Sequence, residues 1–417
     1  MLSGVLTVAA VSSTSSSEDC RTLATRVYVN KGGVSSGLNY CINKFWSMSK
    51  KTNPYALIDP VLSSVQRINI TTGARGSLPL AKWRASINVS QLLPGWLHMD
   101  AVEFNGAEWL VPQTYLPRAG EARLVFIHGG NVQDSALSYY YAGLTSRLAN
   151  WTGLPVLSFD FASAPFVPYP QNVRNVLSYI LWARSHGPRG SGDAGSIILA
   201  ADSEGTLVAL QAAIALIQPD VGTEAGYPPP VLHSPANWLK GLVLSSPVID
   251  VACDTPSMAW NCFNETAGTG DPDTGDCTNT PTWERKVADC RYSYLTYFYG
   301  LAGILQAEGD LPEASRQWEL RQAYLLDASR APLRADLRGL PPMLSLAGTR
   351  DYFYTDGPSL AERACNAGVD VEAFNVEGAF HDFIEYSEGC GGPSVVPESM
   401  EAYRRVANFV ARVVATP

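Results

Sequence analysis

The chain has 417 residues, of which 46% are hydrophobic and only 17% are charged. This composition excludes an intrinsically disordered protein and is sufficient for a large buried core. The net charge is −9 and no basic patch interleaved with aromatic residues is present, so we expect no nucleic acid partner. No apolar run reaches the ~18–20 residues of a membrane span, so no integral span is expected.

The first residues have the character of a leader. Residues 2–10 are apolar, but the run is short and no lysine or arginine precedes it, and a serine-rich stretch follows. We therefore assign residues 1–17 to a leader or the remnant of a signal peptide. Residues 18–98 show no strong strand signal, and we interpret them as an N-terminal cap segment laid over the main domain.

The eight cysteines bear on the compartment. They are Cys20, Cys41, Cys253, Cys262, Cys277, Cys290, Cys365 and Cys390. An even number is compatible with disulfides in an oxidising compartment, whereas scattered buried thiols are the common alternative in a long chain. N-x-S/T sequons at Asn69, Asn88, Asn150 and Asn264 favour a glycoprotein on the secretory route, extracellular or in an organelle lumen. The cysteines form no C-x-x-C pair and histidine is scarce, so we expect no metal site.

From residue 99 onward, buried strands alternate with helices. The first pattern, 101–111, predicts two strands joined as a hairpin at Asn105-Gly106. Further strands are predicted at 123–127, 155–159, 197–201, 242–246, 342–347 and 369–375, and helices at 135–149, 173–184, 207–217, 313–328, 357–367 and 398–414. This alternation predicts an α/β protein with a mainly parallel sheet covered by helices on both faces.

An insertion divides this core. Residues 99–252 and 301–417 form the predicted α/β core, and residues 253–300 form a cysteine-rich cap insertion with a loop-like composition. The insertion region is rich in aromatic residues, namely Trp260, Trp283, Tyr292, Tyr294, Tyr297 and Tyr299. These side chains either line an apolar substrate pocket or pack a small core of the cap itself.

One strand–turn–helix stretch, Ile197 to Thr206, is typical of a nucleophile turn. Ser203 lies at its tip, in a small-x-Ser-x-Gly pattern with Ala201 and Gly205 around it. Small residues are needed there because the sharp turn brings strand and helix close together. A turn that merely caps the following helix is the alternative interpretation.

A nucleophilic serine needs a base and an orienting acid. His381 follows the last predicted strand, whose loop can reach the carboxyl edge of the sheet where Ser203 lies. Asp351 follows strand 342–347 directly and projects from the same edge, while Asp356 lies one loop further on. Glu377 and Asp382 neighbour His381 in sequence, but we expect such neighbours to be unable to turn a carboxylate onto the imidazole.

The remaining requirement is an oxyanion hole of N–H donors. The N–H of Glu204, directly after the serine, is one candidate. Gly129 and Gly130 are the others, since they follow a buried strand and let the backbone approach a ligand closely. The order Ser203, Asp351, His381 is the chain order of α/β-hydrolases, and the predicted mechanism needs no cofactor.

Six motifs in register resemble the hormone-sensitive-lipase-like branch of the α/β-hydrolases, the group of arylacetamide deacetylases and carboxylesterases. They are His128-Gly-Gly-Asn131 (H-G-G-G), Asp160-Phe-Ala-Ser-Ala-Pro165 (D-Y-R-L-A-P), Asp202-Ser-Glu-Gly205 (D-S-A-G), Ser246-Pro-Val-Ile-Asp250 (S-P-W-x-D), Ala347-Gly-Thr-Arg-Asp351 with Asp356-Gly357 (G-x-x-D-x-L-x-D-x-G), and Gly378-Ala-Phe-His381-Asp-Phe383 (G-x-x-H-x-F). The resemblance implies an α/β-hydrolase fold and a serine carboxylesterase or lipase-like enzyme acting on a hydrophobic small-molecule ester.

The departures from that pattern affect the substrate more than the chemistry. Asn131 replaces a glycine, Ala201 and Thr206 replace glycines at the elbow, and Glu204 places a carboxylate beside the serine. We expect this carboxylate to raise the pKa of the base and to disfavour anionic substrates. Two alternatives stay open: a non-catalytic receptor on the same fold, and the same triad acting on an amide, lactone or thioester. The sequence does not indicate an oligomeric state.

Overall fold

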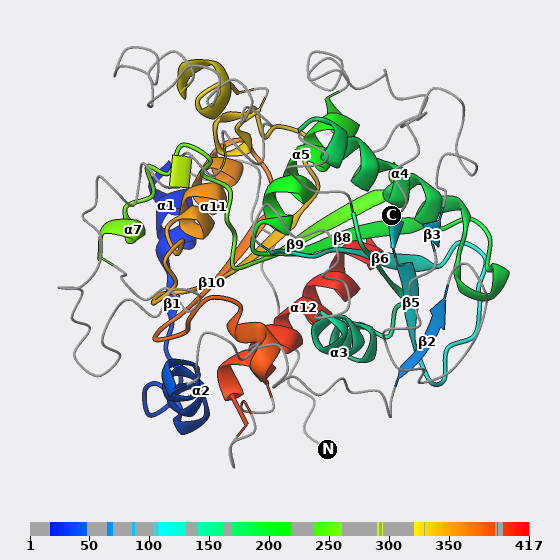
Figure 1. Cartoon of the computed structure of the whole chain (residues 1–417), viewed down its shortest axis with the longest axis horizontal. Coiled ribbons are helices and arrows are strands. Elements are labelled where there is room, and N and C mark those ends of the chain that lie inside the picture. The colour runs from blue at the N-terminus through cyan, green and yellow to red at the C-terminus, as the bar shows by residue number, and fades with distance from the viewer. Residues whose placement is uncertain are drawn as a thin grey trace.

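The computed structural model describes residues 17–47, 65–69, 86–87, 104–105, 107–130, 141–161, 169–218, 237–260, 290–291, 294, 321–328, 330–387, 390 and 395–416. Within these ranges, nine strands form one central sheet in the order β1-β11-β10-β9-β8-β6-β7-β5-β2 (Figure 1). Their bounds are β1 Val27–Tyr28, β2 Val65–Asn69, β5 Ala107–Pro112, β6 Ala122–Ile127, β7 Val156–Phe159, β8 Ser196–Asp202, β9 Leu239–Ser245, β10 Met343–Gly348 and β11 Val371–Val376.

The sheet is mainly parallel. Every neighbouring pair from β1 to β7 is parallel, and only the β7–β5 and β5–β2 pairs are antiparallel, so β5 alone runs opposite to the other strands. Parallel strands direct their carboxyl ends to one edge, so the loops after β6, β8, β9, β10 and β11 gather there. The predicted α/β-hydrolase architecture is confirmed.

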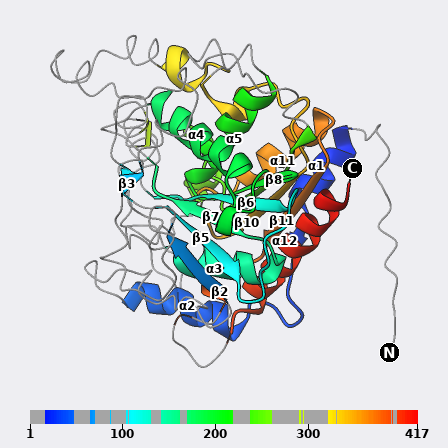
Figure 2. The same ribbon diagram turned by 90° about the vertical axis from the view of Figure 1, so that its right-hand side faces the viewer.

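Helices cover both faces of the sheet (Figures 1 and 2). One face carries α1 (Ser17–Thr25), α4 (Gln171–Ser185), α5 (Gly205–Ile217) and α11 (Asp356–Asn366), and the other carries α3 (Ala142–Thr152) and α12 (Pro397–Ala415). The remaining helices are α2 (Ser36–Ser47) and the short α7 (Ser257–Trp260), with single turns at Pro188–Gly190, Arg321–Leu325, Pro332–Arg334 and Phe383–Tyr386.

Alternation along the buried strands divides the core in two. On β6, Val125 and Ile127 join the cluster under α4 and α5, whereas Leu124 and Phe126 join the cluster under α3 and α12. Successive strand residues point to opposite faces, so a strand covered on both sides must be apolar throughout. This explains why the central strands form continuous apolar runs in the sequence.

The hairpin predicted at Asn105-Gly106 is wrong. The strand β4 (Phe104–Asn105) pairs with β3 (Ser86–Ile87) in a separate two-stranded sheet. β5 is bonded to β2 on one side and to β7 on the other, so neither of its edges is open to β4. The turn residues therefore end one strand and begin another without joining them as partners.

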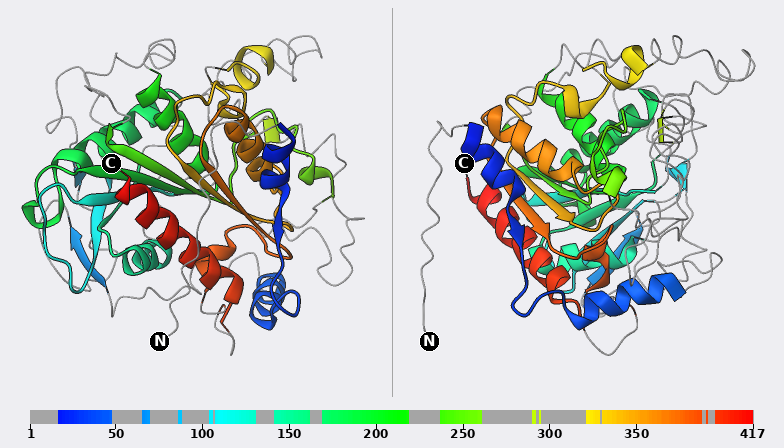
Figure 3. Two further views of the ribbon diagram at one scale, coloured as in Figure 1. Left: turned by 180° about the vertical axis from the view of Figure 1, so that it is seen from behind. Right: turned by 90° about the vertical axis from the view of Figure 1, so that its left-hand side faces the viewer.

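The N-terminal segment contributes to the sheet. The sequence predicts no strand in residues 18–98, but β1 lies at one edge beside β11 and β2 lies at the opposite edge beside β5. Figure 3 shows α1 running alongside α11, where a disulfide joins Cys20 to Cys365. A second disulfide joins Cys41 to Cys390. Residues 17–47 are thus bound to the C-terminal third of the core, whereas β2 is bound to β5 near its start.

A third disulfide lies within the insertion. Cys253, just after β9, is bonded to Cys290, and Tyr294 is buried in the cluster under α4 and α5. Tyr294 therefore packs in the core. Trp260 ends α7, and Trp283, Tyr292, Tyr297, Tyr299, Cys262 and Cys277 lie outside the described residues.

Among the helices that the structure describes, none combines the length and the apolar character needed to cross a bilayer.

Candidate active site

Ser203 stands on a sharp turn between β8 and α5. Its φ is +50°, in the left-handed region, so the chain reverses direction within one residue and lifts the side chain from the sheet. A Cβ on Gly205 would lie 2.4 Å from the Ile127 carbonyl oxygen and 2.5 Å from that of His128. Glycine is required there because strand and helix approach too closely for any side chain.

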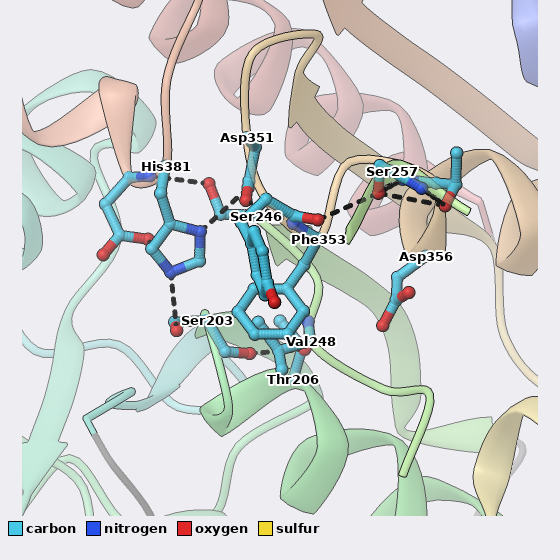
Figure 4. Close-up of polar contacts among 12 residues, drawn as sticks. Ser203, Thr206, Ser246, Val248, Ser257, Asp351, Phe353, Asp356 and His381 are labelled. Atoms are coloured by element: carbon cyan, nitrogen blue, oxygen red, sulfur yellow. Dashed lines mark hydrogen bonds and ion pairs between the residues drawn. The ribbon is translucent and has the colours of Figure 1, made fainter. Parts of the chain in front are cut away.

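Three side chains from three loops form a hydrogen-bonded chain (Figure 4). Ser203 Oγ lies 2.8 Å from His381 Nε2, and His381 Nδ1 lies 2.8 Å from Asp351 Oδ2. The other carboxylate oxygen of Asp351 accepts the Phe353 N–H at 2.8 Å. Asp351 is buried, whereas the His381 side chain keeps 22% of its surface exposed. This arrangement places a nucleophile, a base and an orienting acid in contact.

The histidine and glycines after β6 lie against this turn. A Cβ on Gly129 would fall 2.7 Å from Ser203 Cβ and 2.8 Å from the Tyr141 hydroxyl, so Gly129 touches the nucleophile turn directly. Gly130 has a φ of +120°. Of the predicted oxyanion-hole residues, Gly129 is thus beside Ser203, Gly130 follows it in the chain, and the N–H of Glu204 lies on the turn itself.

His128 is buried and holds the Gly129 peptide. Its Nδ1 lies 2.7 Å from the Gly129 carbonyl oxygen, and its ring stacks on Phe161. Burial lowers the pKa of His128 to about 4, so the ring is neutral at physiological pH. Because the Gly129 oxygen can only accept, Nδ1 carries the proton. The bond fixes the orientation of the peptide that presents the Gly130 N–H.

Asp356, the other acid considered at this edge, does not contact the histidine. Its Oδ2 accepts the N–H groups of Ile249 and Asp250 at 2.7 and 2.8 Å, and its Oδ1 accepts the Thr255 hydroxyl. Burial raises the pKa of Asp356 to about 7, with the neighbouring Asp250 adding to the effect. Asp356 thus fastens the loop after β9 to the start of α11.

The two sequence neighbours of His381 differ from each other. Glu377 is exposed. For Asp382 the expectation is wrong, since its Oδ1 lies 3.3 Å from His381 Nε2. Asp382 has a left-handed backbone with φ +59° and ψ +24°, and its N–H donates to Ser246 Oγ at 2.8 Å. This backbone conformation turns its carboxyl group back onto the imidazole.

Two further residues at the site have no role in the sequence analysis. Thr206, which replaces a family glycine, donates its hydroxyl to the Ser203 carbonyl oxygen at 2.5 Å and accepts the Val248 N–H at 3.1 Å. It therefore ties the nucleophile turn to the loop after β9. Tyr141 is fully buried and stacks on His128. Its position before α3 carries no recognisable motif.

The chain has three other histidines. His186 is exposed at the end of α4, where its ring stacks on Trp182, and His98 and His233 lie outside the described residues. Of the departures from the family pattern, Ala201 is buried in the core under α5, and Asn131 lies outside the described residues.

A parallel sheet with a serine–histidine–aspartate chain at its carboxyl edge defines a serine hydrolase. The family model described as the alpha/beta hydrolase fold matches residues 124–305 and 304–385, which is more than half of the chain. The chain belongs to this family, and its motifs resemble those of the hormone-sensitive-lipase-like branch.

The individual relatives agree with this assignment. The carboxylesterase NlhH of Mycobacterium tuberculosis is 24% identical over 355 residues, covering 84% of this chain and 93% of that protein. The hormone-sensitive lipase of Mus musculus is 29% identical over 168 residues, covering 38% of this chain and 21% of that protein. Among solved structures, an esterase of the bacterial hormone-sensitive lipase family superposes with a TM-score of 0.55 at 21% identity, covering 91% of this chain and 99% of that one.

Proposed function

We propose that this enzyme hydrolyses carboxylic esters through an acyl-enzyme intermediate on Ser203. The observation that carries the proposal is the unbroken chain from Ser203 Oγ through His381 to Asp351, with both links at 2.8 Å. Each member plays the part that its position allows, and no metal or organic cofactor enters the reaction.

In the first half of the reaction, Ser203 Oγ attacks the ester carbonyl carbon while His381 Nε2 takes the hydroxyl proton. Asp351 accepts the Nδ1–H of His381, which fixes the tautomer and stabilises the imidazolium. The N–H groups of Gly129, Gly130 and Glu204 bind the oxyanion. His381 then gives its proton to the leaving alcohol. Water attacks the acyl-enzyme by the same route in reverse.

We further propose an apolar small-molecule ester as the substrate. The half-buried ring of Phe353 lies 6.1 Å from the His381 ring, centroid to centroid, and packs edge-on against Tyr352. Aromatic surface beside the base favours apolar groups on the substrate. On this proposal, kcat/KM is higher for a bulky apolar ester than for an acetate, and F353A lowers it about tenfold for the bulky ester alone.

Turnover of a chromogenic ester by the wild type and S203A tests the reaction. We expect kcat of S203A to fall by at least about 10⁴-fold. The fold of this variant should be unchanged, because the deleted hydroxyl is small. Circular dichroism of S203A and the wild type checks this. Near-normal turnover by S203A would contradict the proposal.

We also propose that the protein folds in an oxidising compartment on the secretory route. Three disulfides among the described residues support this, since such bonds persist where thiols are not kept reduced. Asn150, one of the predicted glycosylation acceptors, is exposed on α3. Expression in a eukaryotic secretory host, followed by intact-mass measurement before and after deglycosylation, tests both points. Retention inside the cell without any mass change would refute them.

A further inference from the structure

Three buried carboxyl groups lie behind the catalytic histidine, and the proposed triad does not use them. Asp202 is the last residue of β8, Asp382 follows His381, and Glu385 lies in the turn Phe383–Tyr386. Asp202 and Glu385 are fully buried and Asp382 is 5% exposed. Buried ionisable groups without a structural partner are costly, so their presence beside a reacting histidine calls for a role.

The geometry singles out Asp382. Its Oδ1 lies 3.3 Å from His381 Nε2, the atom that Ser203 Oγ approaches at 2.8 Å from another direction. The bond from the Asp382 N–H to Ser246 Oγ holds its backbone in the left-handed conformation. Asp382 is therefore fixed at the nitrogen that receives the proton.

The carboxyl groups of Asp202, Asp382 and Glu385 form a buried cluster, and their protonation states follow from their hydrogen bonds. Among the described residues, Glu385 has no hydrogen-bond donor as a carboxylate, and Asp202 has only the neighbouring Ser245 hydroxyl, which partly offsets the effect of burial on its pKa. Burial raises the pKa of both groups well above the usual carboxyl range. A protonated Asp202 donates to Asp382 and thereby favours the ionised form of Asp382. Asp382 is thus the member most readily ionised.

All charges facing the cluster are consistent with a single negative charge on Asp382. Burial raises the pKa of Asp382 and Asp351 adds to this effect, whereas His381 and the hydrogen bonds from Asp202 and Ser246 lower it. On the other side, Arg147 from α3 faces Glu385. A proton on Asp202 and another on Glu385 leave one carboxylate in contact with the imidazole.

We propose that Asp382 is a second carboxylate partner of His381 and stabilises the imidazolium formed during acylation, while Asp202 and Glu385 keep their protons. The inference rests on the proposed ester hydrolysis. As the Ser203 O–H bond breaks, Oγ bonds to the carbonyl carbon, the carbonyl π pair moves to its oxygen, and an Nε2–H bond forms. This N–H points to the leaving oxygen, and Asp382 Oδ1 lies beside the same nitrogen in a charge contact without a hydrogen bond. The leaving oxygen takes the proton when the intermediate collapses, and Asp382 stays ionised throughout.

The contact is favourable only in the charged state of His381. Neutral His381 presents a lone pair at Nε2, which the Asp382 carboxylate repels, whereas the imidazolium presents N–H. Asp382 therefore stabilises the intermediate relative to the resting enzyme, which raises kcat. The same preference raises the pKa of His381, so the free base is available only at higher pH. Asp382 is a positioning residue that acts through His381.

The variant D382N tests this role in the full-length oxidised enzyme. We expect the acid limb of kcat/KM against pH to move down by about one to two pH units, because the amide cannot favour the imidazolium. The plateau kcat should fall about tenfold. E377Q is the matched control, since it removes the same charge from an exposed position four residues from His381, and its profile should equal that of the wild type.

Two further variants keep the test decisive. D382S also removes the charge and must shift the acid limb in the same direction as D382N. If one of the two variants does not fold, the other still provides the test. D202N retains a donor toward Asp382 and should leave the limb in place. A D382N limb that coincides with the wild type overturns the proposal, and so does a D202N limb shifted as far as that of D382N. NMR titration of His381 reads the same pKa without turnover, so a failure of ester hydrolysis is distinguished from a failure of this inference.

Discussion

Two buried aspartates at the ends of one loop serve opposite purposes. Asp351 and Asp356 each keep 1% of their surface exposed and both follow β10. Asp351 binds the His381 imidazole and one backbone N–H, whereas Asp356 binds two backbone N–H groups and the Thr255 hydroxyl. Asp351 thus belongs to a chain that ends at a reactive hydroxyl, and Asp356 to a closed structural clamp. The two residues have the same type and the same burial, so only their hydrogen-bond partners distinguish the two roles.

The largest expected effect falls on the Asp351 side. In D351N the amide can no longer serve as an anionic acceptor for the Nδ1–H of His381, so the tautomer and the imidazolium lose their support. We expect kcat to fall by about 10³–10⁴-fold on a chromogenic ester, with little change in the melting temperature. If D351N loses activity only in proportion to the fraction of protein that is unfolded, Asp351 has a structural role like that of Asp356, and the prediction is wrong.

The converse variant, D356N, should affect the fold. An asparagine offers one acceptor oxygen where the carboxyl group offers two, so either the N–H groups of Ile249 and Asp250 or the Thr255 hydroxyl loses its partner. We expect the free energy of unfolding to fall by roughly 2–4 kcal/mol. The protein that remains folded should turn over esters at close to the wild-type kcat. Denaturant titration and active-site counting together separate the two quantities.

The disulfides extend the comparison between Asp351 and Asp356, because one lies near the catalytic loop of His381 and another holds the helix that begins at Asp356. Cys20–Cys365 holds α11, the helix that begins at Asp356, while Cys41–Cys390 holds the chain that follows the turn after His381. Removing either bond with paired serine substitutions should lower stability by about 2–5 kcal/mol. The stretch that carries Asp382 and Glu385 should respond to loss of Cys41–Cys390 alone. Hydrogen exchange of residues 381–387 would detect this, and equal exchange in both variants would contradict it.

His128 provides the smallest expected effect. Its pKa of about 4 in the folded state lies below the ordinary value of 6.5, so the unfolded chain binds the proton first as the pH falls. The stability from this group is therefore complete above pH 6.5 and is lost as the pH falls toward 4. H128N keeps a donor for the Gly129 oxygen but cannot titrate. Between pH 7 and pH 5 the wild type should lose about 2 kcal/mol more stability than H128N. Parallel stability curves would show that the buried ring is not the titrating group.

Much of this site could be predicted from the sequence, because motif residues follow strands whose order fixes where their loops meet. Ser203, Asp351 and His381 each follow a predicted strand or its turn, and a parallel sheet brings those ends together. Asp382 could not be predicted, since its contact with His381 depends on a left-handed backbone that sequence proximity alone does not imply. Its partner Ser246 becomes relevant only once β9 and the His381 loop are adjacent.

The edges of the sheet were harder to predict for a different reason. β1 has only two residues, Val27 and Tyr28, so it has no periodicity of its own and is defined by its pairing with β11. The turn at Asn105 has hairpin composition, yet β5 bonds β2 and β7 instead. In both cases long-range pairing overrides the local pattern.

The central claim is that Ser203 is the nucleophile activated by His381. Treating the oxidised protein with a fluorophosphonate and mapping the adduct by mass spectrometry tests it directly, because the reagent bonds only to an activated hydroxyl. We predict one adduct per chain, on the peptide that contains Ser203, absent in S203A and slowed strongly in H381A. An adduct on another residue, or ester turnover that persists without labelling of Ser203, would contradict the account.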